Sequence, residues 1–395
     1  MTSRTKVILI PPGFLPVRDY ARVAGPVEKI IFFLIVQLRA RKVEAVYFDP
    51  VTQYSDTHVR KSTRYPIYNP LARTRKLAVV AELAFAVSFV PHLVRLNLAE
   101  DYRIVHVNLN YQVLAIHSLR RILRLNLRIV YTTHNHDLYV TFGNGQRTPL
   151  RARFVERLAV RWADSVTAPT RSVALGVNKL RPLPKSRTIV VPAGVEIEEI
   201  SRHIRTWPLP SDEGLLVCPA RIEPRKNQLG LVKAINILNQ KGSKLRLALV
   251  GPCQDQKYQA EVMRFVDEHK LPVKFTGQLP RRQFFDYYQR ASVIVFPTFS
   301  EAQGLVVLEA MAFGTPVITS RIDPIMDLIS GQDECALLVD PSNPDAIASA
   351  IDRLLHNREL MNRLVANAHA LVEKKYRWSR MASRFVEVYD KLAQT

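Results

Sequence analysis

Short apolar runs bounded by turn residues alternate along this chain with longer segments whose apolar residues recur at helical spacing. This alternation is typical of parallel strands, since each strand needs a crossover helix before the next strand can pair beside it. The pattern occurs in both halves. In the first half we expect strands at 7–10, 44–48, 104–108, 128–132, 165–169 and 188–191. In the second half we expect them at 215–219, 245–251, 273–276, 293–297, 317–320 and 336–339.

The two similar series predict an α/β protein of two Rossmann-like domains with a cleft between them. The length of 395 residues agrees, because it is too long for one ordinary core. Segment 202–214 contains Trp207, Pro208 and Pro210 among polar residues, a composition that favours a linker. We therefore expect a first domain at 1–207, a second at 208–376 and a C-terminal helix at 377–395.

The positive charge of the chain is concentrated in its first half. Residues 1–200 contain 30 Lys and Arg against 14 Asp and Glu, which is +16 of the total of +21. Nucleic acid, an anionic membrane surface and a phosphorylated acceptor would each attract such a field. Charge alone does not choose among them.

No segment reads as a signal peptide or a membrane span. Only four apolar residues precede Pro11, so we expect no secretion and a cytoplasmic protein. Segment 77–94 is strongly apolar, but Glu82 and Pro91 within it favour a buried helix over a span. The three cysteines are scattered without metal-ligand spacing, and we expect them to be buried and reduced.

The most informative stretch is 293–320, which reads as strand, polar loop, helix and strand. Glu301 falls in the loop, and Glu309 falls on the second turn of a helix that begins near Gly304. The backbone N–H groups at that helix start favour phosphate. The two carboxylates suit hydroxyl groups of a sugar and a ribose on either side of it. Two glutamates near a helix start are usually solvated, but Glu309 lies in an almost wholly apolar helix and therefore needs a ligand or a compensating cation.

A second group of charged residues follows the strand at 215–219. Cations at the carboxyl end of a strand in a doubly wound sheet lie where ligands bind. Arg221 can hold phosphate oxygens bidentately, and Lys226 can act as a point charge. We interpret Arg225 as a surface cation, and Pro224 as a residue that stiffens the loop.

Residues 215–330 resemble the C-terminal domain of glycosyltransferase family 4, a group of retaining enzymes with the GT-B fold. The resemblance is carried by Arg221 with Lys226, by the Phe275-Thr276-Gly277 segment, and by two glutamates eight residues apart, Glu301 and Glu309, before the segment 310–317. It implies that Arg221 and Lys226 bind the diphosphate of a nucleotide-sugar, Glu301 the sugar and Glu309 the ribose. It also implies that Thr276 and Gly277 lie near the base. Gly304 and Leu305 belong to the same predicted donor site through the N–H groups of the helix start.

The resemblance extends more weakly over the first half. Gly25 belongs to a reduced glycine-rich loop, with an expected role toward the acceptor or a phosphate. His134, at the end of a strand, is expected near the reacting sugar, where a neutral imidazole can donate a hydrogen bond. The helix at 377–395 is expected to pack back on the first domain. Two departures from the family pattern stand out: Gln303 replaces a phenylalanine, and Asp327 stands where glutamate is usual.

The expected activity is transfer of a hexose from a nucleotide-sugar to a lipid-linked or membrane-proximal glycan, without a metal, because the chain has no Asp-x-Asp motif. An Arg153, Arg157 and Arg161 ridge with four-residue spacing is expected to face anionic lipid at the cytoplasmic side of the membrane. A nucleotide-sugar 2-epimerase is one alternative. A non-catalytic nucleic-acid-binding protein is another, although the chain has no RNA-binding motif and only 8% aromatic residues.

Overall fold

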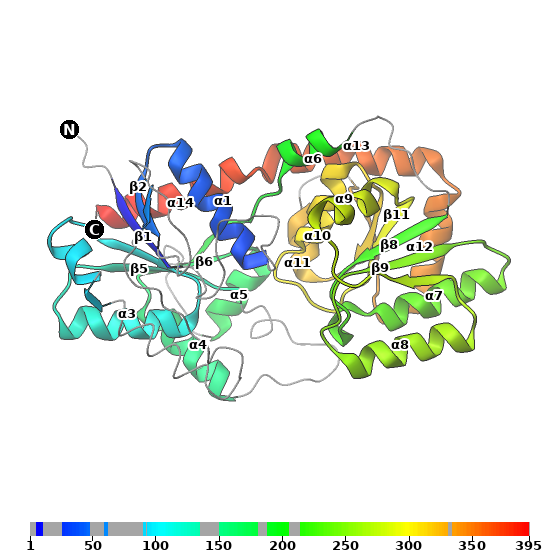
Figure 1. Cartoon of the computed structure of the whole chain (residues 1–395), viewed down its shortest axis with the longest axis horizontal. Helices are drawn as coiled ribbons and strands as arrows, with labels where there is room; N and C mark the ends of the chain where they lie inside the picture. The colour runs from blue at the N-terminus through cyan, green and yellow to red at the C-terminus, as the bar shows by residue number, and fades with distance from the viewer. Residues whose placement is uncertain are drawn as a thin grey trace. The chain divides into compact units, whose positions relative to one another are not determined.

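The structure is a computed structural model, and it divides into two compact units. Unit 1 comprises 1–141, 146–193 and 378–395, and unit 2 comprises 142–145 and 194–377 (Figure 1). The residues that the structure describes are 5–10, 26–47, 59–61, 90–91, 93–134, 150–180, 188–204, 214–330 and 334–394. Each unit is an α/β layer structure in its own right.

The described part of unit 1 is built on a parallel sheet with the strand order β3-β2-β1-β4-β5-β6-β7. The strands are β1 (Lys6–Ile10), β2 (Glu44–Tyr47), β3 (Val59–Lys61), β4 (Ile104–Val107), β5 (Arg128–Thr132), β6 (Ser165–Ala168) and β7 (Thr188–Val190). All six expected strands are confirmed. The edge strand β3 was not expected, because three residues with two cations carry no strand periodicity.

The helices described in unit 1 are α1 (Pro26–Ala40), α3 (Asn110–Ile122), α4 (Leu150–Trp162), α5 (Arg171–Leu180) and α14 (Trp378–Ala393). The C-terminal helix α14 packs beside α1 (Figure 1). The rings of Phe33 and Trp378 stack there with their centroids 4.4 Å apart. Arg41 donates a hydrogen bond of 2.7 Å to the carbonyl oxygen of Ser379. Helix α14 thus belongs to unit 1 and packs on its helix α1.

The described part of unit 2 contains a second parallel sheet, with the order β10-β9-β8-β11-β12-β13. Its strands are β8 (Leu215–Pro219), β9 (Arg246–Val250), β10 (Val273–Phe275), β11 (Val293–Phe296), β12 (Val317–Ser320) and β13 (Leu337–Val339). All six expected strands are confirmed, with ends that agree to within one residue. Since β8, β11 and β12 are buried along their whole length, they read in the sequence as continuous apolar runs.

The helical elements described in unit 2 are α6 (Ile197–His203), η5 (Pro224–Lys226), α7 (Gln228–Gln240), α8 (Gln256–Glu268), α9 (Arg281–Arg290), α10 (Leu305–Phe313), α11 (Asp323–Ile329), α12 (Pro344–Leu355) and α13 (Arg358–Lys375). Polar side chains begin several of them. Asn227, Asp255, Asn343 and Asn357 each accept a hydrogen bond from a backbone N–H three residues later. These caps define where the helices start.

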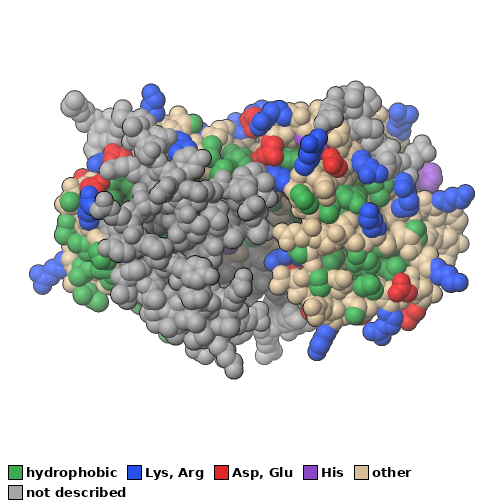
Figure 2. All heavy atoms as spheres, in the orientation of Figure 1, with side chains coloured by type: hydrophobic (Ala, Val, Ile, Leu, Met, Phe, Trp, Pro, Cys, Tyr) green, Lys and Arg blue, Asp and Glu red, His purple; other side chains and the backbone are tan. Residues whose placement is uncertain are grey.

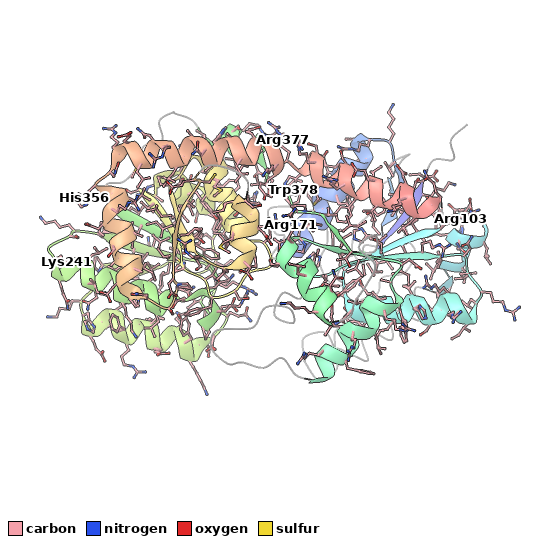
Figure 3. All side chains as sticks on the ribbon, turned by 180° about the vertical axis from the view of Figure 1, so that it is seen from behind. Arg103, Arg171, Lys241, His356, Arg377 and Trp378 are labelled. Atoms are coloured by element: carbon pink, nitrogen blue, oxygen red, sulfur yellow. The ribbon has the colours of Figure 1, made fainter. Side chains whose placement is uncertain are left out.

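The division between the units differs from the expected one. The chain leaves unit 1 after Ala193, whereas we expected the boundary at 207/208. Segment 194–204 belongs to unit 2 because Val195, Ile197 and Ile200 are buried in its core. Of the linker expected at 202–214, residues 205–213 lie outside the described residues, whereas Arg202 and His203 belong to α6 and not to a linker. The chain returns to unit 1 between Arg377 and Trp378, one residue later than expected (Figure 3).

Three further expectations concern the membrane and the cysteines. No helix in the described part of the chain is long and apolar enough to cross a membrane. Most of 77–94 lies outside the described residues, so the buried helix expected there is untested. None of the three cysteines, all of which the structure describes, forms a disulfide, but only Cys218 and Cys335 are buried. The expectation of burial is wrong for Cys253, which is exposed in the loop after β9.

On the face of unit 2 that Figure 2 shows, on the right, the Lys and Arg side chains are spread between hydrophobic and uncharged side chains. This agrees with the modest net charge of the second half of the chain, in which positive and negative side chains are nearly balanced. A long-range electrostatic field from unit 2 is therefore weak, and local groups of charges matter more.

Candidate functional site

The predicted donor residues lie at the carboxyl ends of neighbouring strands in unit 2. Arg221 follows β8, Thr276 and Gly277 follow β10, and Glu301 follows β11. Ligands of doubly wound sheets bind at this edge. We refer to these residues, with Lys226, Gly304, Leu305 and Glu309, as the candidate donor site.

Lys226 and Glu301 contact each other directly, although they are far apart in the sequence. The Lys226 ammonium donates a hydrogen bond to Oε1 of Glu301, and both side chains are largely buried. The ammonium also lies 5.1 Å from the centre of the Phe296 ring. The hydroxyl of Thr298 is 3.3 Å from the same carboxylate oxygen. The two side chains expected to bind different parts of one ligand thus form an ion pair in the protein itself.

Arg225 is not the surface cation that we expected. Its guanidinium donates a 3.1 Å hydrogen bond to the carbonyl oxygen of Ser300 and a 2.8 Å hydrogen bond to Glu223. Its own carbonyl oxygen accepts from the N–H of Phe299 at 2.8 Å. Arg225 therefore fastens the loop of Lys226 to the loop of Glu301. The sequence shows no sign of this role, because the two loops come together only in the fold.

Arg221 is placed differently from Lys226. Its side chain is half-exposed, and its guanidinium lies 3.4 Å from Glu223. The backbone just before it is tightly packed, since a Cβ on Gly251 would lie 2.2 Å from the carbonyl oxygen of Ala220. Arg221 thus combines a fixed backbone with an accessible side chain, as a phosphate-binding arginine requires.

Helix α10 begins and ends as predicted. Gly304 precedes its first turn with a φ of 87°, and a Cβ there would lie 2.6 Å from Cδ1 of Ile325. Gly314 follows its last turn with a φ of 71°. Within the described residues, the N–H groups of Leu305 and Val306 have no hydrogen-bond acceptor. They can therefore donate to an anion at the start of the helix.

Glu309 is buried in α10, as its apolar neighbours predicted. We expected a ligand or a cation as its partner. One partner in the structure is instead the hydroxyl of Tyr288, which donates a 3.1 Å hydrogen bond from α9. Burial, and then the charge of Glu309, raise the pKa of Tyr288 well above its usual value, so the phenol remains a donor. Sequence reasoning missed Tyr288, whose pattern is that of an ordinary core aromatic.

Thr276 and Gly277 form the turn after β10. The N–H of Thr276 donates to the carbonyl oxygen of Leu249 at 3.1 Å, and its hydroxyl donates to that of Gly277 at 2.9 Å. Gly277 has a φ of 65° and forms a backbone bridge with Gly251. The turn is thus tied to the end of β9, one strand away from Arg221.

His134 belongs to unit 1, at the end of β5. Its Nε2 lies 3.1 Å from Oδ1 of Asn108, whose amide donates to the carbonyl oxygen of Ile10 at 3.2 Å. Burial lowers the pKa of His134 to about 4. The ring is therefore neutral near pH 7. Because Oδ1 of Asn108 can only accept, Nε2–H is the donor in this contact, and Nδ1 is left as an acceptor, whereas we expected a hydrogen-bond donor to a sugar. Gly25, the other residue predicted in this half, lies outside the described residues.

A buried chain of hydrogen bonds runs beside His134 in unit 1, and sequence reasoning did not find it. His106 in β4 lies 2.6 Å from the hydroxyl of Tyr389 in α14 and 2.7 Å from that of Thr132 in β5. Thr132 is in turn 2.6 Å from Thr167 in β6. Burial, and then the charge of His134, lower the pKa of His106 to about 3. The chain thus links α14 to three strands of the sheet.

Two models of known families match this chain, one in each half. The model described as Glycosyltransferase Family 4 matches residues 27–199, and the model described as Glycosyl transferases group 1 matches residues 199–371. Two doubly wound α/β units in one chain, with a candidate donor site in the second, are typical of the GT-B class of proteins. The chain belongs to glycosyltransferase family 4 and has the GT-B fold.

Curated relatives carry glycosyltransferase names. The chain is 33% identical over 197 residues to an uncharacterised glycosyltransferase of Methanocaldococcus jannaschii, a match that covers 49% of this chain and 48% of that protein. It is 26% identical over 317 residues to the phosphatidyl-myo-inositol mannosyltransferase of Mycobacterium leprae, which covers 80% of each. The first curated relatives are matched over about half of their own length.

Two solved structures share the fold of this protein over almost the whole chain. A sucrose-phosphate synthase from Thermosynechococcus elongatus gives a TM-score of 0.76 at 23% identity, covering 99% of this chain and 100% of that one. Anabaena HepE in complex with UDP and glucose gives 0.69 at 18% identity, covering 98% and 100%. At these identities the likeness shows the fold alone.

Proposed function

We propose that this protein is a retaining glycosyltransferase that moves a hexose from a nucleotide-sugar to an acceptor. The observation that carries the proposal is the buried pairing of Lys226 with Glu301 beside the open start of α10. A cation, a carboxylate and backbone donors in one place suit a diphosphate joined to a sugar. The binding of UDP by the similar HepE structure supports a nucleotide-sugar donor.

In this proposal, fixed positive charge stabilises the departing nucleoside diphosphate. Arg221, Lys226 and the N–H groups of Leu305 and Val306 surround it, so a metal ion is not required. Glu301 holds sugar hydroxyls, Glu309 holds the ribose, and the turn at Thr276 and Gly277 lies against the base. Nδ1 of neutral His134 accepts a hydrogen bond from a sugar hydroxyl. Retention follows from attack on the face from which the diphosphate departs.

Thermal stabilisation by a panel of UDP-, GDP- and ADP-sugars tests the donor site. We expect one donor to raise Tm in the wild type, and no shift in Lys226→Ala or Glu309→Ala. Lys233→Ala is the control, because Lys233 is an exposed cation on α7. If no nucleotide-sugar stabilises the wild type, the proposal is wrong. A 2-epimerase would instead release free sugar and nucleoside diphosphate without any acceptor.

We further propose that the acceptor is lipid-linked or membrane-proximal and that unit 1 docks at the cytoplasmic face of a membrane. Arg153, Arg157 and Arg161 are exposed on α4, and Phe154 beside them is 62% exposed. A basic ridge with an exposed aromatic side chain suits an anionic lipid surface. The name of the mycobacterial relative, a phosphatidyl-myo-inositol mannosyltransferase, points to the same kind of acceptor.

Vesicle flotation tests the membrane surface. We expect the wild type to bind phosphatidylglycerol vesicles and the Arg153→Glu/Arg157→Glu/Arg161→Glu variant to lose most of this binding. Lys241→Glu/Lys244→Glu/Lys257→Glu changes the same charge on exposed residues of unit 2 and serves as the control. Equal binding of both variants would refute the docking surface. Retention of RNA without nucleotide-sugar binding would support the nucleic-acid-binding alternative.

A further inference from the structure

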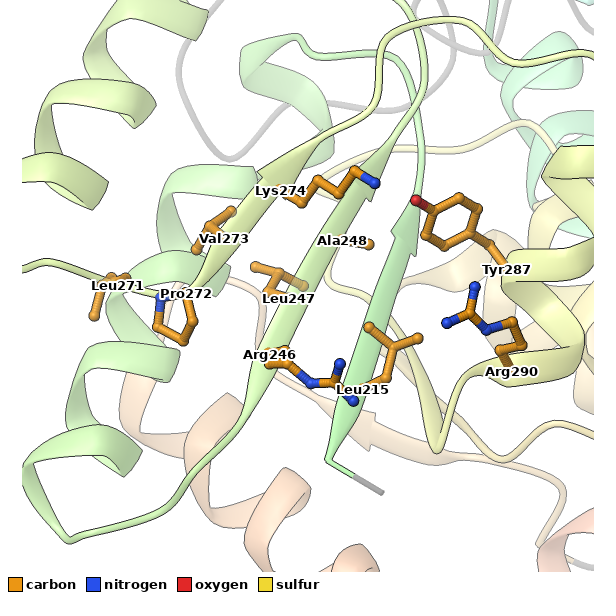
Figure 4. A pocket seen from close by; sticks show the side chains of 10 residues that line it. All are labelled: Leu215, Arg246, Leu247, Ala248, Leu271, Pro272, Val273, Lys274, Tyr287 and Arg290. Atoms are coloured by element: carbon orange, nitrogen blue, oxygen red, sulfur yellow. The ribbon is translucent and has the colours of Figure 1, made fainter. Parts of the chain in front are cut away.

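A pocket of about 370 Å³ lies in unit 2, apart from the candidate donor site (Figure 4). Its residues come from the beginnings of β8 and β9, from β10 with the two residues before it, and from the later turns of α9. None of the residues that we assign to the donor site lines it. Its volume is within the range of small-molecule sites in proteins.

The floor of the pocket is one face of the sheet. Leu215 pairs with Arg246, and Ala248 pairs with Lys274, in the parallel register of β8, β9 and β10. Residues paired in this way project to the same face, so these four side chains share a surface. Because Ala248 is small, it leaves a hollow between the longer side chains. Tyr287 and Arg290 of α9 form the wall.

The charge of the lining is of one sign. Three of the ten lining residues are cations, Arg246, Lys274 and Arg290, and none is Asp or Glu. All three cations are exposed to solvent. Figure 4 shows the Lys274 ammonium extended toward the Tyr287 hydroxyl, with the Arg290 guanidinium on the same side of the pocket as the Tyr287 ring. A phosphate would find charge-assisted donors at this position, and the tyrosine ring offers an apolar face beside them.

We propose that this pocket is a second ligand site, which binds a small organic phosphate such as a sugar phosphate. The cations hold the phosphate group, and the carbon skeleton lies over Leu215 and Ala248 and against the Tyr287 ring. The candidate donor site is at the carboxyl ends of the strands, whereas Leu215 and Arg246 are the first residues of β8 and β9. The two sites have no residue in common, and Lys274 in β10 and Thr276 in the following turn are the members that lie nearest in the sequence.

Isothermal titration with glucose 6-phosphate tests the proposal on the full chain. We expect one molecule to bind the wild type and Lys226→Ala with equal affinity, because Lys226 does not line the pocket. Lys274→Ala/Arg290→Ala should weaken binding by at least about tenfold, which corresponds to the loss of one strong charged contact. Lys233→Ala/Lys257→Ala removes two exposed cations on α7 and α8, outside the pocket lining, and should bind as the wild type does.

A second variant separates shape from charge. Ala248→Val fills the hollow without changing the charge, and we expect it to weaken glucose 6-phosphate more than inorganic phosphate. Unchanged Tm and circular dichroism will show that the variants fold. The proposal is overturned if glucose 6-phosphate does not bind the wild type at 10 mM, a concentration chosen on the order of weak-site dissociation constants. It is also overturned if binding survives in the pocket variants or is lost in Lys226→Ala.

Discussion

The ion pair between Lys226 and Glu301 has a consequence for ligand binding at the scale of single residues. A buried cation whose charge is already balanced by a carboxylate attracts a phosphate less strongly than a cation without that partner. A nucleoside diphosphate must therefore compete with Glu301 for Lys226. In a nucleotide-sugar, the sugar hydroxyls give Glu301 new hydrogen-bond partners as Lys226 turns to the phosphates. The pair can in this way favour the complete donor over its diphosphate fragment.

Replacement of Glu301 by Gln tests this competition. We expect Glu301→Gln to bind UDP, or whichever diphosphate the protein uses, about tenfold more tightly, since Lys226 is no longer neutralised, a change of about 1.4 kcal/mol. Sugar transfer should fall by at least about a hundredfold, because a carboxylate that holds the sugar is lost. Titration calorimetry and initial rates measure the two effects. Weaker UDP binding in the variant would contradict the competition.

The hydrogen bond from Tyr288 to Glu309 makes a second residue-scale prediction. Tyr288→Phe leaves the buried carboxylate without this donor, and we expect it to lower the free energy of unfolding by about 1–3 kcal/mol. If Glu309 holds the ribose, the variant should also bind the nucleotide more weakly, while 2′-deoxynucleotide binding changes less. Urea denaturation and calorimetry provide the measurements, with Tyr287→Phe, at the neighbouring half-buried tyrosine, as the control. Equal losses for both nucleotides would argue against ribose contact.

At the scale of elements, the start of α10 depends on one glycine. Gly304 has a positive φ, and it also packs against Ile325 of α11. A side chain at position 304 would therefore have two separate costs. The backbone strain is local to this residue, whereas the steric contact depends on Ile325 of another helix. Both fix the direction in which the N–H groups of Leu305 and Val306 point.

Gly304→Ala is therefore expected to lower the free energy of unfolding by about 1–3 kcal/mol, since a non-glycine residue in this conformation is strained. It should also weaken diphosphate binding. The double variant Gly304→Ala/Ile325→Val removes the clashing Cδ1 atom but not the backbone strain, so it should restore only part of the stability. Full recovery in the double variant, measured by urea denaturation, would show that the backbone conformation has no cost.

At the scale of the whole molecule, two features lower the stability of the folded protein in acid. One is the net charge of +21, and the other is the pair of buried imidazoles in unit 1. Burial lowers the pKa of His106 to about 3 and that of His134 to about 4 in the folded protein, below the ordinary histidine value of 6.5. Between these values and 6.5 the unfolded chain takes up protons that the folded chain does not. The contribution of these two imidazoles to stability is therefore complete above about pH 6.5 and is lost as the pH falls.

We expect the free energy of unfolding to fall between pH 6.5 and pH 4, with a slope of up to about 1.4 kcal/mol per pH unit for each shifted imidazole. His106→Gln should reduce this slope, because it removes one of the two groups, while His356→Gln, at an exposed histidine, should not. Urea denaturation at a series of pH values gives the comparison. A His106→Gln slope equal to that of the wild type would assign the acid sensitivity to other groups.

The sequence by itself determined the elements of this protein, because their signals are local. Buried parallel strands read as short apolar runs, so strands such as β8 and β12 could be predicted residue by residue, and the glycines around α10 marked its ends. Lys226, Glu301 and Glu309 could be singled out because charge beside a strand end or within an apolar helix is costly without a role.

Only the tertiary structure decided which side chains meet. Arg225 and Tyr288 look ordinary in the sequence, yet Arg225 joins two loops of the candidate donor site and Tyr288 holds Glu309. The boundary moved to 193/194 because Val195, Ile197 and Ile200 are buried in unit 2, whereas turn composition had indicated 207/208. The spacing of residues within a segment predicts whether that segment forms a helix or a strand. Contacts between residues distant in the sequence depend on tertiary packing, because the free energy of burial depends on the surface that each segment covers in the folded protein.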